Sequence, residues 1–297
     1  MPLLDYFVVD VFTETPLQGN PLAVVMNTCA LRTEQMQAIA REFNLSETTF
    51  VERRDAAVER AEGVRVRIFT TQEELKFAGH PTLGTASVLR LHAPEVMRGD
   101  SVTLALNAGA VPVRFEGEGL VGEMTQHDPE FGVELDSPDV ARLTGLTIDD
   151  LDPALCPQVL STGTAFAIVA LRRAESLARF KVNHDEAMAW LRERGARWFY
   201  VVAPEHGKDH AGLQKWRARM QFYGGEDPAT GSAAGCAIAY LVKHGAVAGG
   251  VRIHLRQGLE IGRASDLLLS ADGGARVANV RVAGSTVSVA KGQLFLP

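Results

Sequence analysis

Short runs in which apolar residues alternate with polar ones, or follow one another without a break, recur along the chain and predict many β-strands. In the first half they are Tyr6–Thr13, Leu22–Met26, Thr48–Glu52, Val64–Thr71 and Val102–Leu106, and in the second Ala165–Leu171, Trp198–Ala203, Trp216–Tyr223, Val251–Leu255 and several short runs to Leu296. Strands are therefore expected to predominate in both halves.

Amphipathic helices are fewer, and we expect them at Thr33–Phe43, at His184–Arg194 and after Ser137. Asn183 stands directly before the helix at 184–194 and Glu186 lies three residues later, a spacing that predicts a capping box. Pro138 is typical of a first helical turn.

Two further helices, Pro81–Leu91 and Pro228–Val242, are small or apolar on every face, and each begins just after a Gly-containing loop. A helix that is apolar all round is normally buried. We therefore predict an α+β protein of two pseudo-symmetric domains, each a barrel-like sheet around a central buried helix. A generic pair of α+β domains is the alternative.

The length of 297 residues is enough for two domains of roughly 150 residues each. Glycines and a proline concentrate between residues 117 and 137, which predicts a crossover there. We expect domains at 1–125 and 126–297, and the carboxyl-terminal strand can pair back onto the first domain.

Composition and charge narrow the class of partner. With 46% hydrophobic and 22% charged residues the chain is expected to fold, and a net charge of −6 disfavours nucleic acid and anionic membrane surfaces. No signal peptide or membrane span is evident, so a cytoplasmic location is the default expectation. Cys29, Cys156 and Cys236 lie far apart, without metal-ligand spacing, and no GxGxxG follows a strand. We expect neither a metal site nor a cofactor.

The segments GHPTLGTA and EDPATGSA form an internal repeat at an offset of 147 residues, which aligns Pro81 with Pro228 and Gly84 with Gly231. An Arg-x-Arg strand precedes each segment. Proline suits a first helical turn, and the helix starts leave backbone N–H groups open to an anion. We predict one active site between the two segments, where a small carboxylate binds near Gly79, Thr82, Gly231 and Ser232.

His80 and Asp227 occupy equivalent positions in this alignment, one in each half, and each can serve as acid, base or hydrogen-bonding anchor. The alternative is that Asp227 only caps a helix and that His80 is a satisfied polar residue. Glu47, in NLSETTF, lies between an amphipathic helix and an apolar strand. Partial burial there would raise the pKa of its carboxyl group and suit proton transfer, whereas a surface turn position is the alternative.

The chain resembles the phenazine biosynthesis F family, the PhzF-like proteins. The matching segments are VDVFT (9–13), GNPLAVV (19–25), NLSETTF (44–50), FAGHPTLGTA (77–86), GEDPATGSA (225–233) and QGLEIGR (257–263). The resemblance implies a diaminopimelate-epimerase-like fold and a cofactor-independent isomerase, in which Glu47 moves a proton on a small cyclic or amino acid. It also implies that His80, Asp227 and Ser232 hold the substrate. Ala264 departs from the proline that is frequent in the family.

Two other classes of function stay open. An amino-acid racemase or epimerase on the same scaffold is one, although the two-cysteine form is disfavoured because neither octapeptide contains cysteine. A non-catalytic protein that binds small acids is the other. Homodimers are common on this fold, but no sequence feature fixes the oligomeric state.

Overall fold

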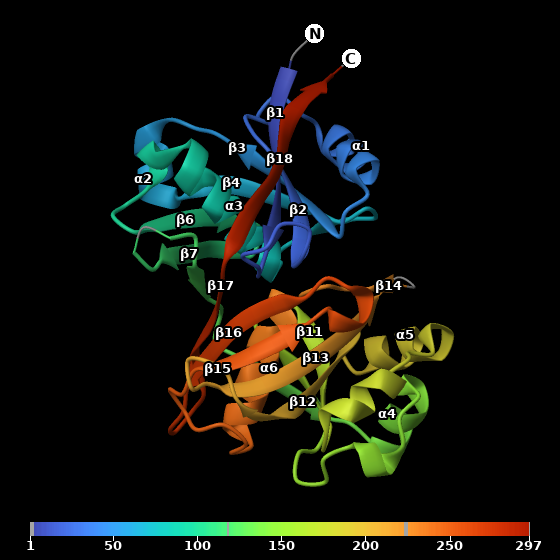
Figure 1. The fold of residues 1–297 in the computed structure, drawn as a ribbon. Coiled ribbons are helices and arrows are strands. Elements are labelled where there is room, and N and C mark those ends of the chain that lie inside the picture. Colours follow the sequence, from blue (N-terminus) through green and yellow to red (C-terminus); the bar gives the residue numbers. More distant parts are fainter. Residues whose placement is uncertain (1–2, 118, 223–224, 297) are drawn as a thin grey trace. The chain divides into compact units, whose positions relative to one another are not determined.

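The computed structural model describes residues 3–117, 119–222 and 225–296, so Tyr223 of one predicted strand lies outside the described part. Contacts divide the chain into two compact units: unit 1 comprises Met1–Thr125 with Ala283–Pro297, and unit 2 comprises Gln126–Val282. Figure 1 shows the elements of both units, and each unit is described by itself below.

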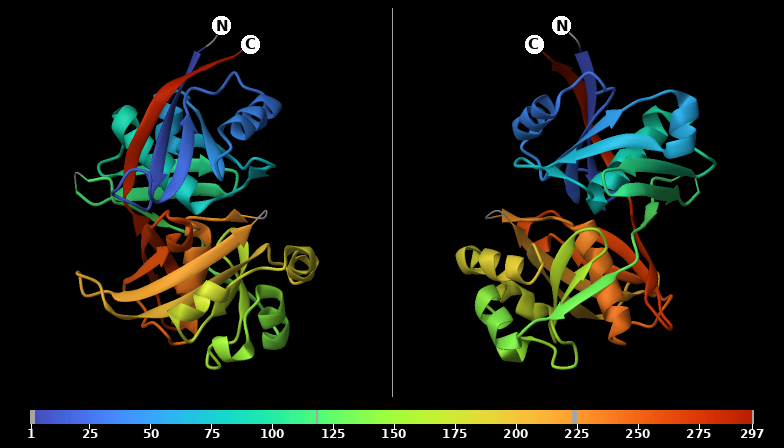
Figure 2. Two further views of the ribbon diagram at one scale, coloured as in Figure 1. Left: turned by 45° about the vertical axis from the view of Figure 1, so that its right-hand side comes forward. Right: turned by 180° about the vertical axis from the view of Figure 1, so that it is seen from behind.

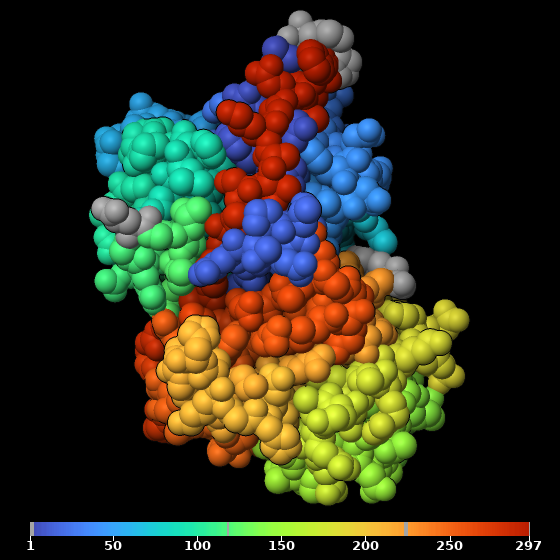
Figure 3. All heavy atoms as spheres, in the orientation of Figure 1, coloured from blue at the N-terminus to red at the C-terminus, as the bar shows by residue number. Residues whose placement is uncertain are grey.

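Unit 1 is built on one curved sheet. Its strands are β1 (Leu3–Val11), β2 (Asn20–Val25), β3 (Glu47–Glu52), β4 (Val64–Phe69), β5 (Glu74–Leu75), β6 (Ser101–Leu106), β7 (Gly109–Phe115), β8 (Gly122–Thr125) and β18 (Thr286–Phe295). Hydrogen bonds give the order β18-β1-β2-β3-β4-β6-β7-β8, with β5 against the end of β4. Only β2–β3 and β4–β6 are parallel. The carboxyl-terminal strand β18 thus lies beside β1, and its outer face is part of the surface in Figure 3.

Helix α3 (Gly79–His92) fills the concave side of this sheet, and every residue from Gly79 to Leu89 is buried. A Cβ atom on Gly84 would lie 2.6 Å from a Leu22 methyl group and 2.8 Å from one of Val11, so glycine allows the helix to approach the strands closely. Helices α1 (Thr33–Phe43) and α2 (Ala56–Glu62) and the 3₁₀ turn Pro94–Val96 complete the unit.

Unit 2 repeats this plan. Its strands are β9 (Glu130–Glu134), β10 (Gln158–Ser161), β11 (Ala165–Ala170), β12 (Trp198–Lys208), β13 (Gln214–Phe222), β14 (Gly225–Glu226), β15 (Ile253–Gln257) and β16 (Ser265–Asp272), and β17 spans Ala278–Gly284. The order is β9-β10-β11-β12-β13-β15-β16, with β14 against β13, and only β11–β12 and β13–β15 are parallel. The parallel pairs occupy the same places as in unit 1.

Helix α6 (Gly231–Lys243) is the counterpart of α3 and is buried on all sides from Gly231 to Leu241 (Figures 1 and 2). A Cβ atom on Gly235 would lie 2.0 Å from the side-chain oxygen of Gln126, so a glycine again permits close packing. Outside the sheet lie α4 (Ser137–Thr144), α5 (His184–Glu193) and the 3₁₀ turns Ile148–Asp150, Ala174–Arg179 and Leu259–Ile261. Two pseudo-symmetric α+β units, each with a sheet around a buried helix, confirm the predicted fold class.

The structure corrects the ends of the two buried helices. Helix α3 starts at Gly79, two residues before the predicted Pro81, and α6 starts at Gly231, three residues after the predicted Pro228. The helix starts are therefore 152 residues apart, rather than the 147 of the sequence alignment. By this offset the second helical residue is His80 in α3 and Ser232 in α6, while Asp227 lies four residues before α6, directly after β14.

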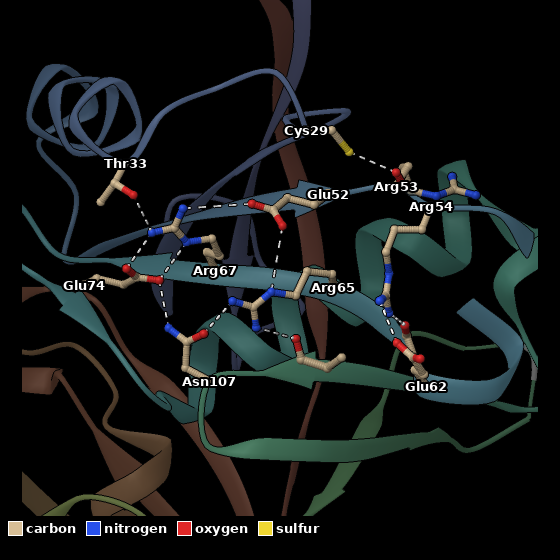
Figure 4. A network of polar contacts seen from close by, with 12 residues as sticks. Cys29, Thr33, Glu52, Arg53, Arg54, Glu62, Arg65, Arg67, Glu74 and Asn107 are labelled. Carbon is tan, nitrogen blue, oxygen red and sulfur yellow. Dashed lines mark hydrogen bonds and ion pairs between the residues drawn. The ribbon is translucent and has the colours of Figure 1, made fainter. Parts of the chain in front are cut away.

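A paired ion contact supports the 152-residue offset. In unit 1 the Arg67 guanidinium donates to both carboxylate oxygens of Glu74, at 2.8 and 2.7 Å, as Figure 4 shows. In unit 2 Arg219 donates to both oxygens of Glu226, at 2.8 and 2.5 Å. The predicted Arg-x-Arg strands are β4 and β13, and in each the second arginine fixes the short strand that leads to the buried helix.

Local capping was predicted less well. Asn183 makes no side-chain capping bond at α5, so the predicted capping box is absent. At α1 the residue before the helix is Arg32, and Gln35 supplies the side-chain contact to its backbone. None of the described helices is long and apolar enough to cross a membrane.

Candidate functional site

In unit 1, two of the predicted residues lie together. Glu47 is the first residue of β3, and His80 lies in the first turn of α3. The Glu47 Oε2 atom is 3.5 Å from His80 Nε2, and their side chains are 15% and 4% exposed. The fold thus places a partly buried carboxylate beside an almost fully buried imidazole, at the amino-terminal end of the central helix.

The His80 imidazole is neutral at neutral pH. Burial lowers its pKa to about 3, and a hydrogen bond with the backbone of Pro21 opposes this shift without cancelling it. The contact with Glu47 is therefore not an ion pair. The amide nitrogen of Asn20, at the start of β2, lies 3.2 Å from His80 Nδ1. His80 Nε2 faces Glu47, and the neutral ring carries one proton, which either nitrogen can hold.

The low pKa of His80 makes stability depend on pH in a defined direction. Its folded-state pKa of about 3 lies below the unfolded value of 6.5, so the unfolded chain binds the proton more readily between these limits. The contribution of His80 to the free energy of unfolding is therefore fully present above pH 6.5 and decreases as the pH falls toward 3. When the pH is lowered from 7 to 5, we expect this histidine alone to reduce the free energy of unfolding by about 2 kcal/mol.

Urea unfolding of the wild type and of His80→Asn at both pH values measures this contribution. The loss of unfolding free energy on acidification should be about 2 kcal/mol smaller in His80→Asn, because all other titrating groups are shared. An equal loss in the two proteins would show that His80 titrates normally in the folded state.

The other two predicted residues of unit 1 belong to the same helical turn. Gly79 is the first residue of α3, and its neighbour Ala78 is the residue before the helix. The Thr82 hydroxyl donates to the carbonyl oxygen of Ala78 at 2.7 Å, so its proton is used within the helix. Binding of substrate by Gly79 and Thr82 stays a prediction.

In unit 2, Asp227 is buried in the segment that leads from β14 into α6. The Thr230 hydroxyl donates to Asp227 Oδ2 at 2.6 Å. Thr230 is the residue before α6, so Asp227 is not the cap of this helix. Its own backbone N–H donates to the carbonyl oxygen of Met220 at 2.9 Å, which holds the segment against β13.

Gly231 and Ser232 form the start of α6 and are buried. The Gly231 carbonyl oxygen accepts from the side-chain amide of Gln126 at 2.9 Å. Four residues after Ser232, burial raises the pKa of the Cys236 thiol to about 11, and the sulfur lies 3.6 Å from the Thr162 hydroxyl. Cys236 is therefore a protonated packing residue at neutral pH.

Sequence reasoning missed three polar residues that surround the predicted ones: Asn20 beside His80, and Thr230 and Gln257 beside Asp227. All three lie within the segments GNPLAVV, GEDPATGSA and QGLEIGR, so the motifs were visible although the contacts were not. Among the described residues, no group of three or more His, Cys, Asp or Glu side chains is arranged to hold a metal ion.

The fold and these two helix starts define a class of two-unit α+β proteins that includes epimerases. A hydroxyproline epimerase from Agrobacterium vitis matches with a TM-score of 0.63 at 13% identity over 98% of this chain and 92% of its own, a likeness of fold alone. The diaminopimelate-epimerase-like fold is thereby confirmed.

The chain belongs to the PhzC-PhzF family, the phenazine biosynthesis-like proteins, whose family model matches residues 9–292. A PhzF-family protein from Bacillus anthracis has a TM-score of 0.85 at 26% identity, with full coverage of both chains. The trans-2,3-dihydro-3-hydroxyanthranilate isomerase of Pseudomonas aeruginosa is 35% identical over 98% of this chain and 99% of its own. An uncharacterized isomerase of Mesorhizobium japonicum is 34% identical over the whole of both chains.

Proposed function

We propose that this protein is an isomerase that moves a proton between carbon atoms of a small carboxylated substrate, with Glu47 as the proton carrier and no cofactor. The observation that carries the proposal is the contact between the Glu47 carboxylate and the buried neutral imidazole of His80. Isomerases with 34 and 35% identity over nearly the whole chain support the class of reaction.

The pair suits proton transfer because its two members differ in role. A carboxylate can remove a proton from one carbon and return it to another, provided that it is held close to both. A neutral imidazole does not neutralise that carboxylate as an imidazolium would. In the tautomer that carries its proton on Nε2, His80 can donate a hydrogen bond to Glu47 or to a substrate oxygen and so fix the direction of the transfer.

The residues of unit 2 suit the binding of an anion. Helix α6 begins with two small residues, Gly231 and Ser232, and backbone N–H groups at a helix start attract a carboxylate. Asp227 supplies a fixed acceptor for a substrate hydroxyl or amino group. We keep as a prediction that both sets of residues serve one substrate.

Racemisation by a pair of cysteine bases fits these residues less well than proton transfer by Glu47. Helix α3 contains no cysteine, and Cys236 in α6 is fully buried with a thiol pKa raised to about 11. A thiol of this kind is a weak base at neutral pH. A racemase that uses Glu47 stays open as the second candidate.

Isotope exchange tests the proposal directly. The full chain is incubated in D₂O with trans-2,3-dihydro-3-hydroxyanthranilate, the substrate named for the Pseudomonas aeruginosa relative, and with a panel of small cyclic and amino acids. We expect an isomer of the substrate in which one carbon-bound hydrogen is replaced by deuterium, measured by NMR and mass spectrometry.

The outcomes separate the candidates. Deuterium at an α-carbon with loss of optical activity would select a racemase, whereas a shifted double bond selects the proposed isomerase. Tight binding without any exchange across the whole panel would favour a binding protein and contradict the proposal.

A further inference from the structure

The backbone and side chain of Asp227 are held by two residues that contact each other. Gln257, the last residue of β15, is fully buried, and its side-chain nitrogen donates to the Asp227 carbonyl oxygen at 2.8 Å and to the Thr230 hydroxyl oxygen at 3.0 Å. Its side-chain oxygen accepts from the Thr230 backbone N–H at 3.1 Å and from the Tyr200 hydroxyl at 2.9 Å.

The orientation of this amide is fixed by its partners. A backbone carbonyl can only accept and a backbone N–H can only donate, so the Gln257 nitrogen must face Asp227 and its oxygen must face the Thr230 N–H. The Thr230 hydroxyl then accepts from Gln257, which leaves its proton for Asp227. A distance of 2.6 Å to Asp227 Oδ2 is typical of a hydroxyl that donates to a charged carboxylate.

We infer that Thr230 and Gln257 are positioning residues that hold the Asp227 carboxylate ionised and aimed in one direction for the proposed reaction. This inference rests on the proposed function of Asp227. The same glutamine binds the Asp227 carbonyl and the Thr230 N–H, and α6 begins only after both of them, at Gly231.

Thr230→Val and Thr230→Ser form a matched pair. Valine keeps the shape but removes the hydroxyl, whereas serine keeps the hydroxyl and removes a methyl group. The carboxyl carbon of Asp227 is followed by ¹³C NMR in carbon-labelled protein, with its signal assigned by loss in Asp227→Asn. We expect the Asp227 midpoint to move upward by about one pH unit in Thr230→Val and to change little in Thr230→Ser. Equal midpoints in the two variants would overturn the inference without touching the proposed reaction.

A double-mutant cycle provides the kinetic test. On a substrate found by isotope exchange, Thr230→Val should lower kcat/KM about tenfold in the wild-type background and have almost no effect in the Asp227→Asn background. A tenfold loss in both backgrounds would show that Thr230 acts independently of Asp227. Normal kinetics in Asp227→Asn itself would instead count against the proposed site.

Gln257→Glu extends the test to the second residue. The substitution keeps the shape of the side chain but removes both donors, and it places an acceptor against the Asp227 carbonyl. We expect its kinetic loss to exceed that of Thr230→Val, because Gln257 contacts both Asp227 and Thr230. Wild-type kinetics in a folded Gln257→Glu variant would remove Gln257 from the inference.

Discussion

Glu47→Gln should lower kcat by about a thousandfold or more while the protein stays folded, because glutamine keeps the shape of the side chain but cannot take up and return a proton. Glu47 begins β3 and is partly exposed, so the substitution leaves the apolar core intact. Steady-state kinetics, with exchange of substrate hydrogen in D₂O as a second measurement, checks the expectation. Thermal unfolding checks the fold.

Glu52→Gln is the matched control. Glu52 ends the same strand and faces Arg65 at 3.8 Å, an outer-face contact visible in Figure 4. The change in charge is the same, but the residue lies outside the proposed machinery, so kcat should stay within about twofold of wild type. Equal activity of Glu47→Gln and the wild type would remove Glu47 from the role of proton carrier.

The architecture could be predicted because its signals are local. The helices that became α3 and α6 are small or apolar on every face, and burial on all sides follows from that pattern alone. Alternating or continuous apolar runs predicted strands that pair in parallel as well as strands that pair antiparallel. The internal repeat of GHPTLGTA and EDPATGSA then indicated that the two halves are related.

The ends of these helices could not be predicted in the same way. Pro81 lies in the first turn of α3, as proline at a helix start usually does, whereas the equivalent expectation for Pro228 was wrong. Gln257, which lies 30 positions from Asp227 and 27 from Thr230, binds the backbone of both residues in the segment before α6. A long-range hydrogen bond of this kind leaves no periodic pattern in the sequence.

The same limit applies to His80. Its position at a helix start was readable, but its low pKa depends on burial within the folded unit, and its partner Asn20 lies 60 positions away. The alignment of the two octapeptides paired His80 with Asp227 because the residues around them are identical or similar. The elements of the fold pair His80 with Ser232, so the resemblance of the two octapeptides does not mark equivalent places in the two units.

Arg219→Met should destabilise the protein by about 3–5 kcal/mol, because it leaves the Glu226 carboxylate buried without its main partner. The side chains of Arg219 and Glu226 are only 9% and 8% exposed, and hydrogen bonding to Glu226 raises the pKa of the arginine. Arg219 also donates to the Leu177 carbonyl oxygen at 2.6 Å. Urea unfolding measures the loss.

The internal symmetry of the chain provides the control. Arg67→Met breaks the corresponding pair of unit 1, but Arg67 and Glu74 are 15% and 23% exposed, so water can rehydrate the carboxylate that remains. Its loss should be less than half that of Arg219→Met. Adding Glu226→Gln to Arg219→Met removes the buried charge and should restore about half of the stability. Equal losses in both arginine variants, with no recovery in the double variant, would show that packing around Arg219 rather than its charge holds the strand before α6 in place.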